Sequence, residues 1–168
     1  MTDATPAQLA VRALAAAGQT VACAESLTAG LLSATLADVP GASAVLRGGV
    51  VAYATELKAR LLAVGDVYRD GAVSAPTARA MARNVRALCG ADWGVSLTGV
   101  AGPEPQEGQP VGTVFLGVAG PDSDAVTRLA LAGDRPAIRQ AAVAAALWAV
   151  ADAVREGRTG ADVHPGGS

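Results

Sequence analysis

Hydrophobic residues recur along this chain at two alternating spacings. Intervals of three and four residues, which place apolar side chains on one face of a helix, predict helices over 6–17, 31–37, 55–62, 75–89 and 135–155. Shorter β-prone runs predict strands over 20–24, 45–53, 93–98, 111–119 and 126–131. The last two strands are expected to pair antiparallel through the turn residues 120–122. Strands that alternate with helices indicate an α/β layered sheet.

The segment 20–30 changes from a strand pattern to a helix pattern across two hydroxyl residues, Ser26 and Thr28. Free backbone N–H groups and the helix dipole at such a start favour anionic ligands and developing negative charge. Ser26 is therefore either a nucleophile or, like Thr28, an ordinary helix cap. Ligands of α/β sheets bind beyond the carboxyl ends of the strands, so Ser26, Tyr53 and the Thr98-Gly99 loop are expected to converge.

The chain offers few groups that could activate a serine. Its one histidine, His164, lies in the Gly-rich segment 157–168, which is predicted to be a disordered tail, so a Ser-His-Asp triad is excluded. Lys58 is the one lysine beside twelve arginines. A buried lysine can lose its proton and act as a base, whereas arginine cannot. Lys58 is thus either the base for Ser26 or one more solvated charge.

Composition narrows the class of protein. The residues are 51% hydrophobic but 3% aromatic, so Ala, Val and Leu must fill the core. A net charge of −2 without a basic block argues against nucleic acid as a partner. No signal peptide or charge-free run of about 18 residues is found, so no membrane association is expected. Cys23 and Cys89 have no metal or redox spacing and are predicted to be small core residues.

Two further segments have the composition of an anion site. The loop 98–102, Thr-Gly-Val-Ala-Gly, follows a predicted strand and is either a source of backbone N–H donors or an ordinary turn. Arg135 and Arg139 lie about one turn apart at the start of the last helix. They either bind an anion such as a ligand phosphate or face solvent.

Eight ordered blocks together resemble the C-terminal domain of the competence/damage-inducible protein CinA and the PncC-type nicotinamide mononucleotide deamidases. The blocks are 24–30 (AESLTAG), 47–53 (RGGVVAY), 58–62 (KARLL), 71–74 (GAVS), 90–94 (GADWG), 98–103 (TGVAGP), 110–114 (PVGTV) and 133–135 (GDR). The resemblance implies a three-layer α/β/α sandwich with a mixed, mostly parallel sheet. We expect one such domain over 1–156, followed by the tail 157–168.

The resemblance also implies an activity, the hydrolysis of the carboxamide of nicotinamide mononucleotide to nicotinate mononucleotide and ammonia in pyridine-nucleotide recycling. Ser26 matches the family's nucleophile and Lys58 its partner lysine. No cofactor or metal is expected, and a cytoplasmic homodimer is implied. Backbone N–H groups near Thr28–Gly30 or at Gly99 would hold the oxyanion. The expected substrate-binding residues are Glu25, Thr28, Ala29, Gly30, Gly49, Tyr53, Thr98, Gly99, Arg135 and Arg139, with the choice between the two arginines left open.

Two segments depart from the family pattern. The family shows Glu-Ser-Cys-Thr-Gly-Gly around the nucleophile and a glycine-rich stretch after Ala-Gly-Pro. Leu27 and Ala29 replace the Cys and the first Gly, and an Ala at position 29 calls for an ordinary helical backbone. The residues 104–107, Glu-Pro-Gln-Glu, replace the glycine-rich stretch after Ala-Gly-Pro. These departures leave an alternative function open, that of a nucleotide-binding module without catalysis.

Overall fold

A five-stranded mixed sheet forms the centre of the protein, with strand order β2-β1-β3-β4-β5. The computed structural model describes residues 3–161, with side chains through residue 157. The strands are β1 (Val21–Glu25), β2 (Leu46–Val51), β3 (Trp93–Gly99), β4 (Thr113–Ala119) and β5 (Asp124–Ala130). The helices are α1 (Pro6–Ala17), α2 (Leu31–Ala37), α3 (Thr55–Leu62), α4 (Val67–Asp70), α5 (Ala75–Cys89) and α6 (Arg135–Ala161), with a 3₁₀ turn η1 (Ala42–Ala44).

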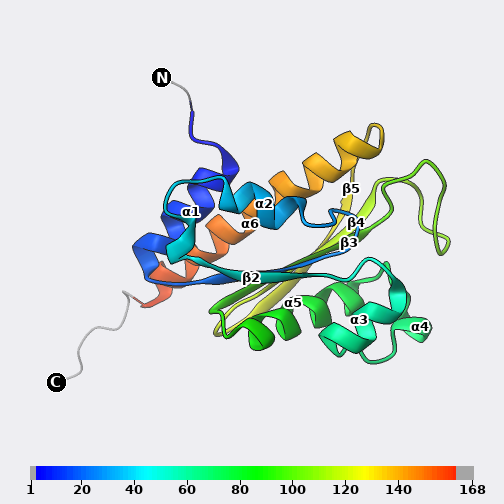
Figure 1. Cartoon of the computed structure of the whole chain (residues 1–168), viewed down its shortest axis with the longest axis horizontal. Coiled ribbons are helices and arrows are strands. Elements are labelled where there is room, and N and C mark those ends of the chain that lie inside the picture. Colours follow the sequence, from blue (N-terminus) through cyan, green and yellow to red (C-terminus); the bar gives the residue numbers. More distant parts are fainter. Residues whose placement is uncertain (1–2, 162–168) are drawn as a thin grey trace.

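Helices cover both faces of this sheet, which confirms the predicted three-layer α/β/α sandwich. Helices α1, α2 and α6 lie on one side, and α3, α4 and α5 lie on the other (Figure 1). Strand β1 pairs in parallel with β2 and β3, whereas β4 pairs antiparallel with β3 and with β5. Four of the five strands therefore run in one direction, and β1, β2 and β3 end at the same edge of the sheet.

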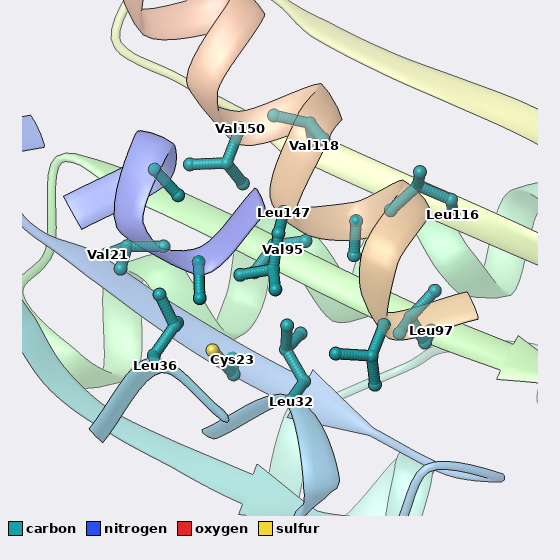
Figure 2. Close-up of a cluster of buried hydrophobic side chains, with 14 of the residues drawn as sticks. Val21, Cys23, Leu32, Leu36, Val95, Leu97, Leu116, Val118, Leu147 and Val150 are labelled. Atoms are coloured by element: carbon teal, nitrogen blue, oxygen red, sulfur yellow. The ribbon is translucent and has the colours of Figure 1, made fainter. Parts of the chain in front are cut away.

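The larger core lies between the sheet and the layer of α1, α2 and α6. Figure 2 shows aliphatic side chains from β1, β3 and β4 meeting those of α2 and α6, among them Cys23, Leu32, Leu97 and Leu147. Burial raises the pKa of the Cys23 thiol to about 12, which makes it an unreactive core residue as predicted. Cys89 is also a free thiol and is half-buried.

Helix α6 supplies one wall of this core. By length and mean hydropathy, 1.4, its segment Arg135–Gly157 is apolar enough to cross a membrane. Its aliphatic side chains, including Ile138, Leu147 and Val150, are however buried against α1, β3 and β4. Packing in the protein core thus accounts for the hydropathy of α6.

Each strand begins or ends within two residues of its predicted bounds, and the helices show two larger differences. Strand β2 ends at Val51, and the predicted polar connection 66–71 contains the one-turn helix α4, anchored by buried Val67. Helix α6 continues to Ala161, so the predicted tail boundary at 157 falls within a helix. The rest of the predicted tail, including His164, lies outside the described residues.

Candidate active site

Ser26 lies one residue beyond β1, at the edge where the three parallel strands end. Its backbone N–H donates to the carbonyl oxygen of Leu97 at 2.9 Å, which continues the pairing of β1 with β3. Its carbonyl oxygen accepts from the N–H of Ala29 at 3.0 Å, so the chain turns sharply directly after the strand. The side chain is buried at the carboxyl edge of the sheet, where ligands of α/β folds bind.

Lys58 approaches Ser26 from helix α3, which begins shortly after β2 ends at the same edge. Its Nζ lies 3.1 Å from Ser26 Oγ, 2.9 Å from the carbonyl oxygen of Ala52 and 3.4 Å from that of Tyr53. The Lys58 side chain is 2% exposed. Burial lowers the pKa of Lys58, and the carboxylates of Glu107 and Glu56 oppose this effect in part. The structure thus joins the two residues that sequence reasoning paired as nucleophile and base.

The start of helix α2 is already occupied by a carboxylate from within the chain. Glu25, 1% exposed, accepts hydrogen bonds from the N–H groups of Gly30, Leu32 and Ser33 at 3.2, 2.8 and 3.0 Å and from Ser33 Oγ at 2.7 Å. Glu25 therefore caps the start of α2, a structural role that differs from the substrate contact implied by the resemblance. The N–H of Gly30 donates to the Glu25 carboxylate, and the N–H of Ala29 donates to the carbonyl oxygen of Ser26. Neither N–H is therefore free to hold an oxyanion.

The turn after Ser26 leaves two other donors unused. Within the described residues, the backbone N–H groups of Leu27 and Thr28 have no hydrogen-bond acceptor. The carbonyl oxygen of Ser26 is directed at Ala29, and in a planar trans peptide the Leu27 N–H points the opposite way. Leu27 lines the pocket that holds Ser26. An N–H of the residue after the nucleophile is a frequent oxyanion donor, and Leu27 stands at that position.

Ala29 adopts a left-handed backbone conformation, with φ +48°. The expectation of an ordinary helical backbone at this residue was therefore wrong. The sharp turn that follows β1 requires positive φ at both Ala29 and Gly30, and helix α2 begins only at Leu31. An alanine can adopt this conformation at a cost of about 1 kcal/mol relative to glycine.

The two candidate arginines have different positions. Arg135 lines the Ser26 pocket, is exposed, and donates to Tyr53 Oη and to the carbonyl oxygen of Gly102, both at 2.6 Å. Arg139 instead donates from Nε and Nη2 to the carbonyl oxygens of Leu27 and Thr28, both at 2.9 Å. Arg135 is thus placed to meet a ligand, whereas Arg139 braces the turn beside the nucleophile. The Thr28 side chain is fully buried, and its hydroxyl has no partner within the described residues.

A pocket of about 130 Å³ opens beside the Ser26 hydroxyl. Tyr53, Thr98 and Gly99, which were expected to converge with Ser26 at the strand ends, line it, and so does Arg135 from the start of α6. Thr98 is fully buried and donates from its hydroxyl to the carbonyl oxygen of Ala72 at 2.6 Å. A side chain at Gly99 would lie 2.6 Å from the carbonyl oxygen of Thr113, so glycine is required here for the approach of β4.

Gly49, another predicted contact, lies elsewhere. It pairs with Cys23 in the sheet, and a Cβ at this position would lie 2.8 Å from Ser33 Oγ and 2.9 Å from the carbonyl oxygen of Cys23. Gly49 thus allows β2 to pack closely against β1 and α2, and it does not line the Ser26 pocket.

Comparison with known proteins agrees with this arrangement. A family model described as the CinA C-terminal domain matches residues 3–154. The chain belongs to the CinA C-terminal domain family. A CinA-like protein of Frankia casuarinae is 56% identical over 130 residues, which cover 76% of this chain and 30% of that protein. A putative competence-damage inducible protein of Geobacillus sp. is 51% identical over 140 residues, which cover 82% of this chain and 34% of that protein. This chain thus spans about a third of the length of these relatives.

Solved CinA-family structures have the same fold over nearly their whole length. The CinA superfamily protein KP700603 of Klebsiella pneumoniae superposes with a TM-score of 0.87 at 31% identity, covering 90% of this chain and 96% of that one. The competence/damage inducible protein CihA of Agrobacterium tumefaciens superposes with a TM-score of 0.84 at 31% identity, and the match covers 92% of this chain and 98% of that one. The predicted fold class and family are both confirmed.

The sequence analysis of this CinA-family chain missed several pocket residues. Thr55, Ala72, Val73, Glu104 and Gln106 also line the Ser26 pocket. The sequence pointed to this region only through the family match of block 71–74 and the departure of segment 104–107 from the family pattern, and neither assigned these residues to the pocket. Among residues 3–161, no cluster of His, Cys, Asp and Glu side chains could hold a metal ion.

Proposed function

We propose that this chain hydrolyses the carboxamide of nicotinamide mononucleotide to nicotinate mononucleotide and ammonia. The observation that carries the proposal is the buried contact of 3.1 Å between Lys58 Nζ and Ser26 Oγ, because a serine beside a desolvated lysine is an activated nucleophile. The carboxamide specificity is supported by the sequence blocks shared with the nicotinamide mononucleotide deamidases.

The first half-reaction forms an acyl-enzyme. Neutral Lys58 takes the proton from Ser26 Oγ as that oxygen attacks the carboxamide carbon. The developing oxyanion accepts from the backbone N–H groups of Leu27 and Thr28, which no protein acceptor occupies within the described residues. The Lys58 ammonium then gives its proton to the departing nitrogen. Ammonia leaves, and the nicotinoyl group remains as an ester on Ser26.

The second half-reaction restores the free enzyme. Lys58 takes a proton from water, whose oxygen attacks the ester carbon through the same oxyanion contacts. The C–O bond to Ser26 breaks, Lys58 returns a proton to Oγ, and nicotinate mononucleotide leaves as the carboxylate while the second proton of the water passes to solvent. One water is consumed and one ammonia is released.

The size of the pocket restricts how a mononucleotide would bind. Its volume of about 130 Å³ is well below the ~300–1,000 Å³ of typical small-molecule sites. We therefore place the carboxamide and part of the pyridine ring beside Ser26 and the ribose phosphate toward the mouth. There the guanidinium of Arg135, an exposed cation, is available to the phosphate.

The test is ammonia release from nicotinamide mononucleotide by the wild type, Ser26→Ala and Lys58→Arg. We expect both variants to lose at least a thousandfold in kcat, since arginine keeps the positive charge but cannot accept the proton. Arg60→Lys, an exposed exchange in the same helix, is the matched control and should retain wild-type activity. Full activity in Ser26→Ala would refute the proposed nucleophile.

The same preparation tests the alternative of a binding module without catalysis. Tight binding of nicotinamide mononucleotide by calorimetry, with no ammonia released by the wild type, would favour that alternative. The homodimer and the cytoplasmic location implied by the resemblance belong to our proposal as well. Light scattering of the purified chain measures the first, and fractionation of the source cells measures the second.

A further inference from the structure

One wall of the Ser26 pocket is a loop, residues 103–110, that crosses over a turn formed by residues 71–73. The Glu107 carboxylate in this loop accepts hydrogen bonds from the backbone N–H of Ala72 at 3.2 Å and of Val73 at 3.0 Å. Glu104 and Gln106 of the loop line the pocket, and so do Ala72 and Val73 of the turn. A single side chain outside the pocket lining therefore joins two of its walls.

The turn side of this link is firmly held. The Ala72 carbonyl oxygen accepts from the hydroxyl of Thr98 in β3 at 2.6 Å. The carbonyl oxygen of Gly71 accepts from Ser74 Oγ at 2.8 Å and from Thr77 Oγ1 at 2.6 Å, at the start of α5. The loop residues 103–108, by contrast, are all exposed. Because charge-assisted hydrogen bonds are among the stronger ones, Glu107 fixes the exposed loop to the rigid turn.

The backbone at Glu107 lies in a tight turn between Gln106 and Gln109, in which Glu107 and Gly108 both have positive φ. Glu107 has φ +51°, in the left-handed region that residues with a long side chain seldom adopt. Such a conformation persists when surrounding contacts over-determine it. Here those contacts are the two hydrogen bonds to the turn and the bridge between Gln106 and Gln109, whose backbone N–H groups reach each other's carbonyl oxygens at 3.2 and 2.8 Å.

The charge of Glu107 acts on the site as well. Two carboxylates raise the pKa of Lys58 against the effect of burial. The effect of Glu107 is the larger, and that of Glu56 on α3 is the smaller. These two residues differ in one respect that is useful for a test. Glu107 links the loop to the turn, whereas Glu56 lies exposed in the first turn of α3 and does not line the pocket.

We propose that Glu107 is a positioning residue of the Ser26–Lys58 site, which fixes the loop wall of the substrate pocket to the turn 71–73. The proposal deepens the function proposed above and rests on it for the identity of the substrate. It assigns a role to the segment 104–107, where the chain departs from the glycine-rich pattern of the family.

The positioning role is tested by the KM for nicotinamide mononucleotide in Glu107→Ala, Glu107→Gln and Glu56→Gln. We expect a KM raised about tenfold in Glu107→Ala, which frees the loop, and a smaller rise in Glu107→Gln, whose amide oxygen can still accept one N–H. Glu56→Gln removes a charge without freeing the loop and should keep the wild-type KM. A wild-type KM in Glu107→Ala, or an equal rise in Glu56→Gln, overturns this role.

A second test of the positioning needs no substrate, because Lys58 is the one lysine of the chain and a Glu107 carboxylate held beside the site acts on it. Labelling lysine with ¹³C at Cε gives a single resonance whose pH titration reports Lys58 directly. Removing a nearby negative charge disfavours the ammonium form, so the pKa of Lys58 should fall in Glu107→Gln and fall less in Glu56→Gln. A titration of Glu107→Gln that coincides with the wild type overturns this role.

These measurements separate failure of the inference from failure of the proposed function. If the wild type releases no ammonia, its calorimetric Kd for nicotinamide mononucleotide replaces KM, with the same order expected among the variants. If the wild type neither turns over nor binds that nucleotide, the positioning role falls with the substrate. The lysine titration then still shows whether the Glu107 carboxylate is held beside Lys58. Wild-type turnover with unchanged KM and titration in the Glu107 variants leaves the function standing and removes the inference.

Discussion

Lys58 Nζ lies 3.1 Å from the Ser26 hydroxyl oxygen while it also faces the carbonyl oxygens of Ala52 at 2.9 Å and Tyr53 at 3.4 Å. Carbonyl oxygens only accept hydrogen bonds, so each takes one N–H of the lysine. A neutral amine has two N–H bonds and one lone pair, and in this arrangement the lone pair remains for the serine hydroxyl. An ammonium would instead donate its third N–H to the Ser26 oxygen, so the three contacts accommodate both protonation states through which a general base passes.

This geometry predicts a pH dependence of the reaction. Burial lowers the pKa of Lys58 below its ordinary value of 10.5. Because only the neutral amine accepts the Ser26 proton, kcat/KM should rise with pH through the lowered pKa and level off before 10.5. The pH dependence is measured from the rate of ammonia release at a series of pH values. The midpoint of this rate profile should agree with the pKa of Lys58 obtained from its ¹³C titration. A rate that is flat across the titration of Lys58 would contradict the assignment of the base.

The same burial makes the stability of the fold depend on pH. Between the lowered pKa of the folded state and the unfolded value of 10.5, the unfolded chain binds a proton at Lys58 that the folded chain does not. The free energy of unfolding should therefore increase with pH across this window and lose that gain below it. Urea denaturation of the wild type and Lys58→Met at several pH values isolates the effect, since the Met variant lacks the titrating group. Equal pH slopes in the two proteins would refute this prediction.

Arg135 and Arg139 should affect different kinetic constants. Arg135 is exposed at the pocket and is placed for the substrate, so Arg135→Ala should raise KM about tenfold with a smaller change in kcat. Arg139 binds the carbonyl oxygens of Leu27 and Thr28, whose N–H groups are the proposed oxyanion donors. Arg139→Ala should therefore lower kcat about tenfold or more with little change in KM. Steady-state kinetics of the two variants decides it, and a change in KM alone for Arg139→Ala would contradict the bracing role.

The sequence predicted the pairing of Ser26 with Lys58 because both residues carried independent signals. The hydrophobic pattern placed Ser26 after a strand, and the use of arginine at every other cationic position singled out Lys58. The cap of α2 had no such signal, because Glu25 reaches across the Ser26 turn to N–H groups as far as Ser33 instead of occupying the usual cap position. The sequence did not show that Gly49 packs against β1 and α2 or that Arg139 braces the turn after Ser26, because a family resemblance does not show which neighbour a residue contacts.

Glu25 should contribute to stability more than to substrate binding. Its carboxylate accepts three backbone N–H bonds and the Ser33 hydroxyl in a buried position. Glu25→Gln replaces one acceptor oxygen by a donor that faces N–H groups, and we expect it to lower the free energy of unfolding by about 2–3 kcal/mol. Urea denaturation measures the change. Ser33→Ala, which removes one of the four bonds, should cost about 1 kcal/mol, and a larger loss than in Glu25→Gln would argue against the cap.

Ala29 offers a stabilising change next to the nucleophile. Its φ of +48° is a conformation that glycine adopts without the steric cost of a Cβ atom. Ala29→Gly should therefore raise the free energy of unfolding by about 1 kcal/mol and leave the Ser26–Lys58 contact, and with it kcat, unchanged. Ala63, with φ +47° at the end of α3, is the matched control because it has the same backbone conformation but lies outside the Ser26 turn. Ala63→Gly should give a similar gain in urea denaturation. A gain at Ala63 together with a loss at Ala29 would show that the Ala29 methyl group contributes packing to the turn that outweighs its backbone strain.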